Sequence, residues 1–422
     1  MAAIIFLVLL GFCLIGVPIA TSIGVASTGY LAFFTELPLM VGPQRMFNTI
    51  DSFPLLAIPF FVLSGGLMQD GGISRRLIRL ADSCIGHMTG GLTIVVIVCS
   101  MFFAAVSGSS AATITALGVI LIPAMIQKGY STPFAASVQA CSGQMGVIIP
   151  PSIPMVVYAV ATETSVAALF KAGVLPGILM GVSLIIYCYF TCKKRGYTGN
   201  PSRATKAERW AAFKDAIWAI MMPVIILGGI YSGYFTPTEA AAIAVAYAVI
   251  VGIFIYKELN IKNIPRIMLE SAVTTATILF LIATAGLLAW VMGRLNVPQT
   301  VAKFFIAISS NKIVFLLIVN LLLFFVGMFF DAAPAIIILA PLLAPVAESF
   351  GISLIHFGII MVVNLAIGFC TPPVGVNLFL SSKIAGIKLE NMLGEVIRFL
   401  IILFIDMMLI TFVPFLSLAL VG

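Results

Sequence analysis

Long apolar runs recur along the whole chain and set the strongest limit on how it can fold. Hydrophobic residues make up 62% of the 422 residues, and charged residues make up only 9%. Soluble domains carry about 25% charged residues, and a helix that spans a bilayer needs about 20 consecutive, mainly apolar residues. Runs of that length follow one another from the first residues to the last. We therefore predict an all-α polytopic membrane protein.

The N-terminal run, MAAIIFLVLLGFCLIGVPIA, has no basic segment before it and further spans follow it. We interpret it as a retained first span rather than a cleaved signal peptide. The net charge of +7 comes from basic residues in the connections, which indicates membrane topology and not a nucleic-acid partner. The seven cysteines lie in or beside apolar segments, and two histidines form no ligand-spaced cluster. We expect neither a cofactor nor a transition-metal site.

Two apolar segments, 91–127 and 312–349, are too long for one crossing and carry polar residues near their centres. Each is either two crossings or a re-entrant hairpin. Each is followed by an apolar segment that prolines interrupt, 131–161 and 352–382. If both long segments are hairpins, ten crossings remain, five with one hairpin in each half.

The halves are then residues 1–192 and 215–422, and a polar linker, 193–214, joins them. With this topology, one side of the membrane collects seventeen of the 22 basic residues. These are Arg75, Arg76, Arg79, Lys128, the seven in the linker range, Lys257, Lys262, Arg266, Lys383, Lys388 and Arg398. Cytoplasmic loops carry an excess of Lys and Arg. We therefore expect the linker to be cytoplasmic and both termini to be periplasmic.

A constant offset of 222 residues, the separation of Pro123 and Pro345, aligns the helix-breaking residues of the two halves. The same offset places Gly146 on Gly368 and Pro150–Pro151 on Pro372–Pro373. Apolar matches are common in such a composition, but prolines and glycines in register are not. Because the two copies enter the membrane from opposite sides in this topology, we predict an inverted repeat.

The paired prolines raise a physical problem, because proline breaks a helix and leaves backbone groups without partners. Irregular backbone is tolerated at membrane depth only where protein encloses it or a wet cavity adjoins it. Interrupted helices present carbonyl oxygens at one end and N–H groups at the other, which suit a small cation and an anionic group. The two breaks therefore predict a binding site near the middle of the bilayer.

Candidate site residues lie at the hairpin tips and at the helix breaks. The first tip is rich in hydroxyls, which could bind a ligand or only pack helices together. The second tip carries Asp331, and a carboxylate in such a run is usually functional, although a structural hydrogen bond is the alternative. The candidates are Ser107, Gly108, Ser109, Ser110 and Thr113 at the first tip, Asp331 at the second, and Gly143, Gly146, Pro150, Pro151, Ser152, Gly368, Thr371, Pro372, Pro373 and Asn377 at the breaks.

Four other residues are ambiguous. Asn364 and Ser142 occupy equivalent positions and either line the site or only link helices. Asp406 has no counterpart in the first half, so we favour a contact to another helix or subunit over a transport role. Arg294, beside Trp290, suits an interface anchor or a docking charge.

Several uncommon strings carry a family resemblance, in order and with the expected spacing. LLAIPFFVLSGGLM at 55–68, VSGSSAAT at 106–113, VIIPPSIPMVVYA at 147–159 and GFCTPPVGVNLF at 368–379 resemble the large membrane subunit of tripartite ATP-independent periplasmic (TRAP) transporters. The resemblance covers essentially the whole chain. It implies an elevator-type transporter in the bacterial inner membrane, in which a mobile domain holds the hairpins and broken helices. It also implies a separate small four-helix membrane subunit and a periplasmic binding protein that delivers a carboxylate substrate.

The resemblance further implies sodium-driven uptake with two sodium sites. One would use Ser107, Ser109 and Ser110 with carbonyls between Gly146 and Pro150. The other would use the backbone near Asp331 with Gly368 and Thr371. The residues expected to face the substrate are Ser110, Ser152, Asp331 and Asn377.

Three other functions compete with this interpretation. A standalone sodium/dicarboxylate carrier would share the hairpins but need no binding protein. An intramembrane enzyme could use Ser109 or Ser110 as nucleophile, but neither histidine is placed to act as its base. A passive channel fits poorly, because matched hairpins that close one site from opposite sides favour alternating access. Energy coupling by ATP is disfavoured, because the sequence contains no G-x-x-x-x-G-K-[ST] phosphate loop. Sialic acid, another sugar acid and a C4-dicarboxylate all remain open as substrates.

Overall fold

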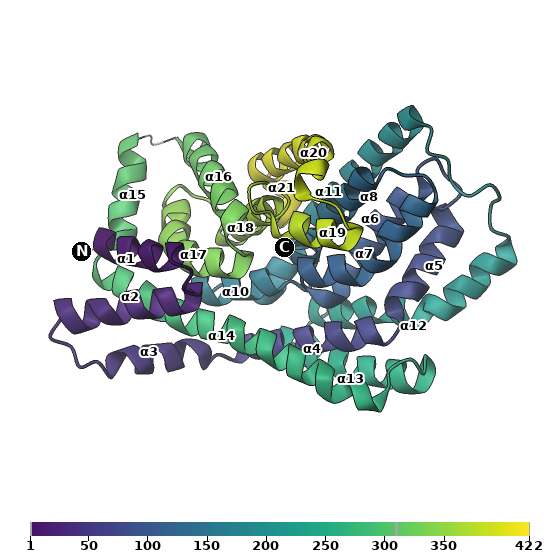
Figure 1. Cartoon of the computed structure of the whole chain (residues 1–422). Helices are drawn as coiled ribbons and strands as arrows, with labels where there is room; N and C mark the ends of the chain where they lie inside the picture. Colours follow the sequence, from purple (N-terminus) through teal and green to yellow (C-terminus); the bar gives the residue numbers. More distant parts are fainter. Residues whose placement is uncertain (1, 309–310, 422) are drawn as a thin grey trace.

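The computed structural model describes residues 2–308 and 311–421, and all regular secondary structure in these ranges is helical. The all-α prediction is confirmed. Nine helical segments in the described ranges are long and apolar enough to cross a membrane. In Figure 1 the helices form one elongated body, with the N-terminus at one end and the C-terminus near its centre.

The first half ends with a helix that reaches into the predicted linker. Its elements are α1 (Ala2–Leu14), α2 (Ile19–Phe34), α3 (Val41–Ile50), η1 (Phe53–Leu56), α4 (Ala57–Asp70), α5 (Ile73–Ile85), α6 (Gly91–Ser107), α7 (Ser110–Gln127), α8 (Thr132–Gly143), α9 (Met145–Ile148), α10 (Ile153–Thr162) and α11 (Val166–Arg195).

The second half has the same order of hairpin and broken helix. Its elements are α12 (Lys206–Tyr231), α13 (Pro237–Ile250), the π-helical turn η2 (Val251–Ile255), η3 (Ile261–Asn263), α14 (Ile264–Arg294), α15 (Val297–Ile308), α16 (Lys312–Phe329), α17 (Ala332–Ser349), α18 (Leu354–Gly368), α19 (Val376–Ala385), η4 (Leu389–Met392), α20 (Leu393–Phe412) and α21 (Phe415–Leu418).

The linker is shorter than the predicted range 193–214. Helix α11 continues through Arg195 and α12 begins at Lys206, so only residues 196–205 lie between them without helix. A capping box starts α12, because Thr205 and Glu208 bond to each other's backbone N–H groups. Charged residues that suggested a loop therefore form helix ends instead.

The offset of 222 residues also relates the helix boundaries. It maps α7 onto α17 residue for residue, and it maps their N-cap residues, Ser109 and Asp331, onto each other. Gly129 and Gly351, which follow these helices, both have positive φ angles, of 84° and 70°. In Figure 1, α6 and α7 lie to the right and α16 and α17 to the left. The two hairpins therefore approach the centre from opposite ends.

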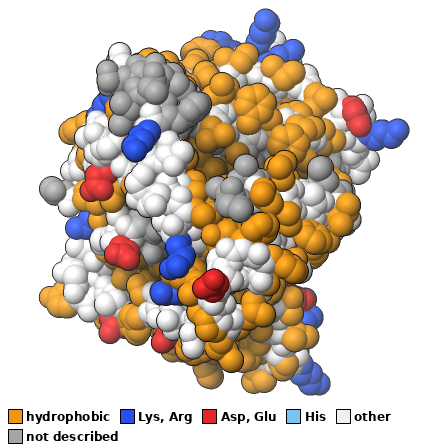
Figure 2. Space-filling model, turned by 90° about the vertical axis from the view of Figure 1, so that its left-hand side faces the viewer, with side chains coloured by type: hydrophobic (Ala, Val, Ile, Leu, Met, Phe, Trp, Pro, Cys, Tyr) orange, Lys and Arg blue, Asp and Glu red, His pale blue; other side chains and the backbone are white. Residues whose placement is uncertain are grey.

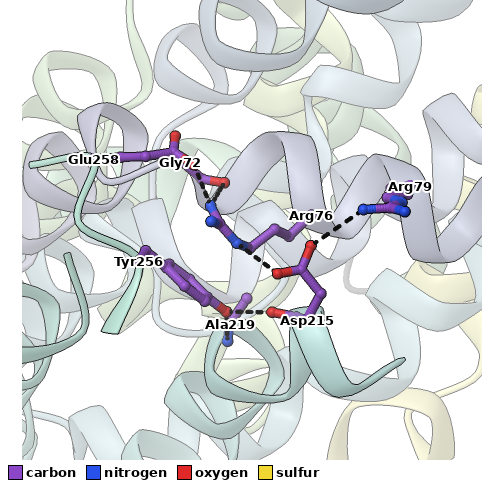
Figure 3. Close-up of polar contacts among 7 residues, drawn as sticks. All are labelled: Gly72, Arg76, Arg79, Asp215, Ala219, Tyr256 and Glu258. Carbon is purple, nitrogen blue, oxygen red and sulfur yellow. Dashed lines mark hydrogen bonds and ion pairs between the residues drawn. The ribbon is translucent and has the colours of Figure 1, made fainter. Parts of the chain in front are cut away.

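Helix α5 connects α4 to the first hairpin, and a polar cluster fastens it to the second half (Figure 3). Arg76 forms ion pairs with Asp215 at 3.1 Å and with Glu258 at 2.7 Å. Its guanidinium also lies 3.7 Å from the centre of the Tyr256 ring. Burial raises the pKa of Tyr256 to about 12, so the phenol stays neutral and donates to the Asp215 carbonyl at 2.9 Å.

The surface of the molecule is strongly apolar. Figure 2 looks onto the left-hand end of Figure 1, and hydrophobic side chains cover much of that face while charged ones are scattered. Leu7 and Phe33 are 68% and 83% exposed. Water would solvate such side chains poorly, whereas lipid chains accommodate them, so this surface suits a membrane-embedded protein.

Candidate functional site

The first hairpin tip is a compact turn of hydroxyl groups. Gly108 ends α6 with a φ of 62°, a conformation that glycine adopts without steric cost. The Ser109 side chain caps α7 by accepting from the Ala112 N–H. Thr113 donates to the Ser109 carbonyl at 2.8 Å, and its hydroxyl lies 3.2 Å from that of Ser107. The tip thus concentrates hydroxyl and carbonyl oxygens around Ser109.

The first broken helix packs directly against this tip. A Cβ atom at Gly146 would lie 2.4 Å from the Ser109 carbonyl oxygen, so only glycine allows this approach. Helix is absent from Ile149 to Ser152, and Ser152 then caps α10 while donating to the Val147 carbonyl at 2.6 Å. The Pro150–Pro151 pair therefore lies in the unwound segment that the sequence predicted.

The second tip has a carboxylate in the place of Ser109. Asp331 is the N-cap residue of α17, and its side chain accepts from the Ala332 N–H at 2.6 Å. Gly327, one turn earlier, is packed against the second broken helix: a Cβ atom at Gly368 would lie 2.3 Å from the Gly327 carbonyl carbon. Both broken helices therefore meet their hairpins through a buried glycine.

The second break runs from Phe369 to Gly375, between α18 and α19. Thr371 is buried there, and its hydroxyl donates to the Ile367 carbonyl at 2.9 Å. Asn377 is also buried and links the two halves, because its side-chain oxygen accepts from the Ser110 hydroxyl at 3.0 Å. Its amide nitrogen lies 3.4 Å from the Ala140 carbonyl.

Both tips line one cavity of about 660 Å³. Ser107, Ser109 and Ser110 contribute from the first tip and Asp331 from the second. Six of the residues expected to bind sodium or substrate are not among those that line this cavity. They are Gly146, Pro150, Ser152, Gly368, Thr371 and Asn377.

The comparison with known sequences identifies the family. The sequence profile of "Tripartite ATP-independent periplasmic transporter, DctM component" matches residues 6–416. The chain belongs to this TRAP large permease family.

Characterised relatives of this TRAP permease are similar over most of the chain. A C4-dicarboxylate TRAP large permease, DctM, of Pseudomonas aeruginosa is 44% identical over 89% of this chain and 88% of its own length. A sialic acid TRAP large permease, SiaM, of Vibrio cholerae is 38% identical over 96% of this chain and 95% of its own. An isethionate TRAP permease, DctMQ, of Oleidesulfovibrio alaskensis is 43% identical over 96% of this chain, which spans only 64% of that longer protein.

A solved structure shares the fold of this TRAP permease. The YdaH transporter of Alcanivorax borkumensis superposes with a TM-score of 0.64, covering 99% of this chain and all of that one. Only 16% of aligned residues are identical, so the likeness concerns the fold alone.

A further part of the cavity wall was missed by the sequence analysis. It consists of α4 and one face of α14, which presents Arg266, Glu270, Thr274 and Thr277. These polar residues follow one another at intervals of four, four and three positions, which places them on one face of a mainly apolar helix. That spacing could have indicated that this face of the helix meets water. The wall adds the only Arg or Lys among the described residues that line the cavity.

The ambiguous residues occupy helix–helix contacts. Asn364 donates to the Asn320 side chain at 2.6 Å, and Ser100 donates to Ser142 at 3.2 Å. The Asp406 side chain is buried and accepts from the Ser183 hydroxyl. This contact agrees with the helix-linking role that we favoured for Asp406.

Arg294 lies over the Trp290 ring, with its guanidinium carbon 5.8 Å from the ring centre, and Arg45 lies 5.0 Å away. A Trp between two cations is typical of a membrane interface. Within residues 2–308 and 311–421, no group of three or more His, Cys, Asp or Glu side chains could hold a metal ion.

Proposed function

We propose that this chain drives sodium-coupled uptake of an organic acid across the bacterial inner membrane, together with a separate small four-helix permease and a periplasmic binding protein. The observation that supports this most is the cavity between the two tips, which Ser109 and Asp331 line from opposite halves. A site closed by one hairpin from each side suits alternating access, because each hairpin can open toward one compartment.

The tips supply the ligands that a sodium ion needs. At the first tip, the Ser109 carbonyl and the Ser107 and Thr113 hydroxyls lie within hydrogen-bonding distances of one another. At the second, we propose that the backbone near Asp331 acts with Gly368 and Thr371. Unwound carbonyls and half-helix ends coordinate sodium in secondary transporters. The same helix starts favour anions through their N–H groups, so a cation and a carboxylate can occupy neighbouring positions.

We further propose that the elements lining the cavity belong to two bodies. The hairpins and broken helices form one wall, while α4 and α14 form the other. We propose that the first wall moves past the second in an elevator motion, and that the second belongs to a scaffold completed by the small permease. The predicted orientation, with periplasmic termini and basic cytoplasmic connections, is part of this proposal.

The substrate is proposed as an organic anion. Relatives are named for a C4-dicarboxylate, sialic acid and isethionate, which share an acidic group and little else. A standalone carrier is the second candidate, which uptake without any binding protein would favour. An enzymatic role is disfavoured because the characterised relatives are permeases and because Ser110 contacts the Asn377 amide, which is not a base.

Uptake into proteoliposomes tests the proposal. The chain, reconstituted with its small permease, should accumulate radiolabelled succinate, N-acetylneuraminate or isethionate only with an inward sodium gradient and the binding protein. Asp331→Ala and Thr371→Ala should each reduce uptake at least ~100-fold, about 2.7 kcal/mol of lost stabilisation. Glu348→Ala, an exposed carboxylate near the other end of α17, is the matched control. Full activity in both site variants would remove these residues from the site.

A further inference from the structure

The lining of the cavity between the two tips includes one cationic side chain among the described residues. The described residues that line the cavity include three carboxylates, Asp70, Glu270 and Asp331, and Arg266 is the only Arg or Lys among them. An organic anion therefore meets a lining with an excess of negative charge. Any attraction from a lining side chain must come from Arg266.

Arg266 is the first of the α14 residues that line the cavity, at one end of their row. It belongs to the first turn of α14, and its partner Asp70 is the last residue of α4. Thr277, which also lines the cavity, is eleven residues further along α14, a distance of about 16 Å. This end of the row lies where α4 ends and α5 with its arginines begins, on the side that the charge bias assigns to the cytoplasm.

Its existing partners hold Arg266 only loosely. Its guanidinium forms ion pairs with Asp70 at 2.7 Å and with Glu270 at 3.2 Å. The Arg266 side chain is 56% exposed and that of Glu270 is 64% exposed. Exposed ion pairs are weak because water and salt screen them. Another carboxylate or a sulfonate can replace either partner, since guanidinium binds such groups through two parallel N–H donors.

Helices α4 and α14 are in close contact beside Arg266. A Cβ atom at Gly66 would lie 3.0 Å from the Ile267 side chain, so α4 and α14 pack closely beside Arg266. The backbone at Arg266 is therefore held by the contact between α4 and α14, whereas its exposed side chain can reach an anion in the cavity.

We propose that Arg266 forms a second, transient site for the anionic group of the substrate, through which the substrate leaves toward the cytoplasm. This inference rests on the proposed function. Arg266 draws the anion away from Asp331, and Asp70 and Glu270 then compete for the guanidinium and release the anion. The ligand class is any small carboxylate or sulfonate.

Uptake by the reconstituted complex tests this role, with radiolabelled succinate, N-acetylneuraminate and isethionate as probes. Arg266→Gln should lower the uptake rate about tenfold, a change of about 1.4 kcal/mol. Arg266→Lys, which keeps the charge, should restore most of it. Lys262→Gln is the matched control, an exposed cation in η3 that does not line the cavity, and it should behave as wild type.

Two further readouts separate an electrostatic role from a structural one. Raising the ionic strength inside the vesicles from ~0.01 to ~0.1 M shortens the screening length from about 30 to about 10 Å. This should slow wild-type uptake and leave Arg266→Gln unchanged. Asp70→Asn removes a competitor, so it should lower both the KM and the maximal rate. This result does not depend on whether Arg266→Gln folds.

The outcomes distinguish the two proposals. If wild type transports an anion but Arg266→Gln matches Lys262→Gln, or if Asp70→Asn leaves both constants unchanged, the role of Arg266 is overturned while the proposed function stands. If wild type accumulates none of the three anions, the proposed function fails, and this inference fails with it.

Discussion

At the scale of single residues, two glycines decide how closely each broken helix can approach its hairpin. Gly146 lies against the Ser109 carbonyl and Gly368 against the Gly327 backbone, and in each case the nearest atom is main chain. Main-chain atoms cannot rotate aside as the end of a side chain can. Both glycines were predicted from their register with the paired prolines, but the residues they contact were not, because spacing along the chain does not reveal partners across the fold.

Replacing Gly146 with alanine should therefore damage both stability and transport. The added methyl group would overlap the Ser109 backbone, and overpacking of this kind costs about 1–3 kcal/mol. We expect a lower melting temperature in detergent and a large loss of uptake. Gly228→Ala on α12 is the control, because nothing lies within 4 Å of its Cβ position and alanine favours helix there by up to ~1 kcal/mol. Equal melting temperatures for the two variants would contradict the close approach.

At the scale of elements, the strongest sequence signals were the breaks and the long apolar helices. The offset that aligns the prolines also aligns α7 with α17. The sequence analysis did not predict the three shorter helices α3, α5 and α15. Helix α5 shows why: Ile73, Leu77 and Ala81 are buried at intervals of four, but the exposed Arg75 and Arg79 occupy the other face. Such an amphipathic helix has the charge content of a loop, and its partners on α12 and in the segment after η2 are far away in sequence.

The ion pairs that Arg76 forms with Asp215 and Glu258 should contribute much of the stability with which α5 packs against the second half. Arg76→Met would remove the cation that pairs with Glu258 and the nearer of the two that pair with Asp215, the other being Arg79 at 3.7 Å. The Arg76 side chain is only 15% exposed. Loss of one partner from a largely buried ion pair costs up to about 3–5 kcal/mol, and the half-exposed carboxylates reduce this to about 1–3 kcal/mol. Denaturant or thermal unfolding would measure it. Arg75→Met changes an exposed neighbour and should have little effect; an equal loss in both variants would refute this contribution.

At the scale of the whole molecule, the residues of one site come from elements that are more than two hundred positions apart. Ser110 bonds to Asn377, and the tips at Ser109 and Asp331 line one cavity. The internal repeat predicted this convergence, because two copies of one unit in opposite orientations place their breaks at the same depth. The α14 wall could not be predicted in this way, because α14 lies outside the hairpins and broken helices that the repeat aligns.

Side-specific labelling tests the central claim, that the two hairpins enter the membrane from opposite faces. Lys128→Cys and Ser349→Cys place single exposed thiols at the bases of α7 and α17, in a background where the exposed native thiol is removed by Cys84→Ser. A membrane-impermeant maleimide added to intact cells stripped of outer membrane should label position 349 and not position 128. Inverted vesicles should give the reverse. Labelling of both positions from the same face would contradict the inverted repeat and the shared site built on it.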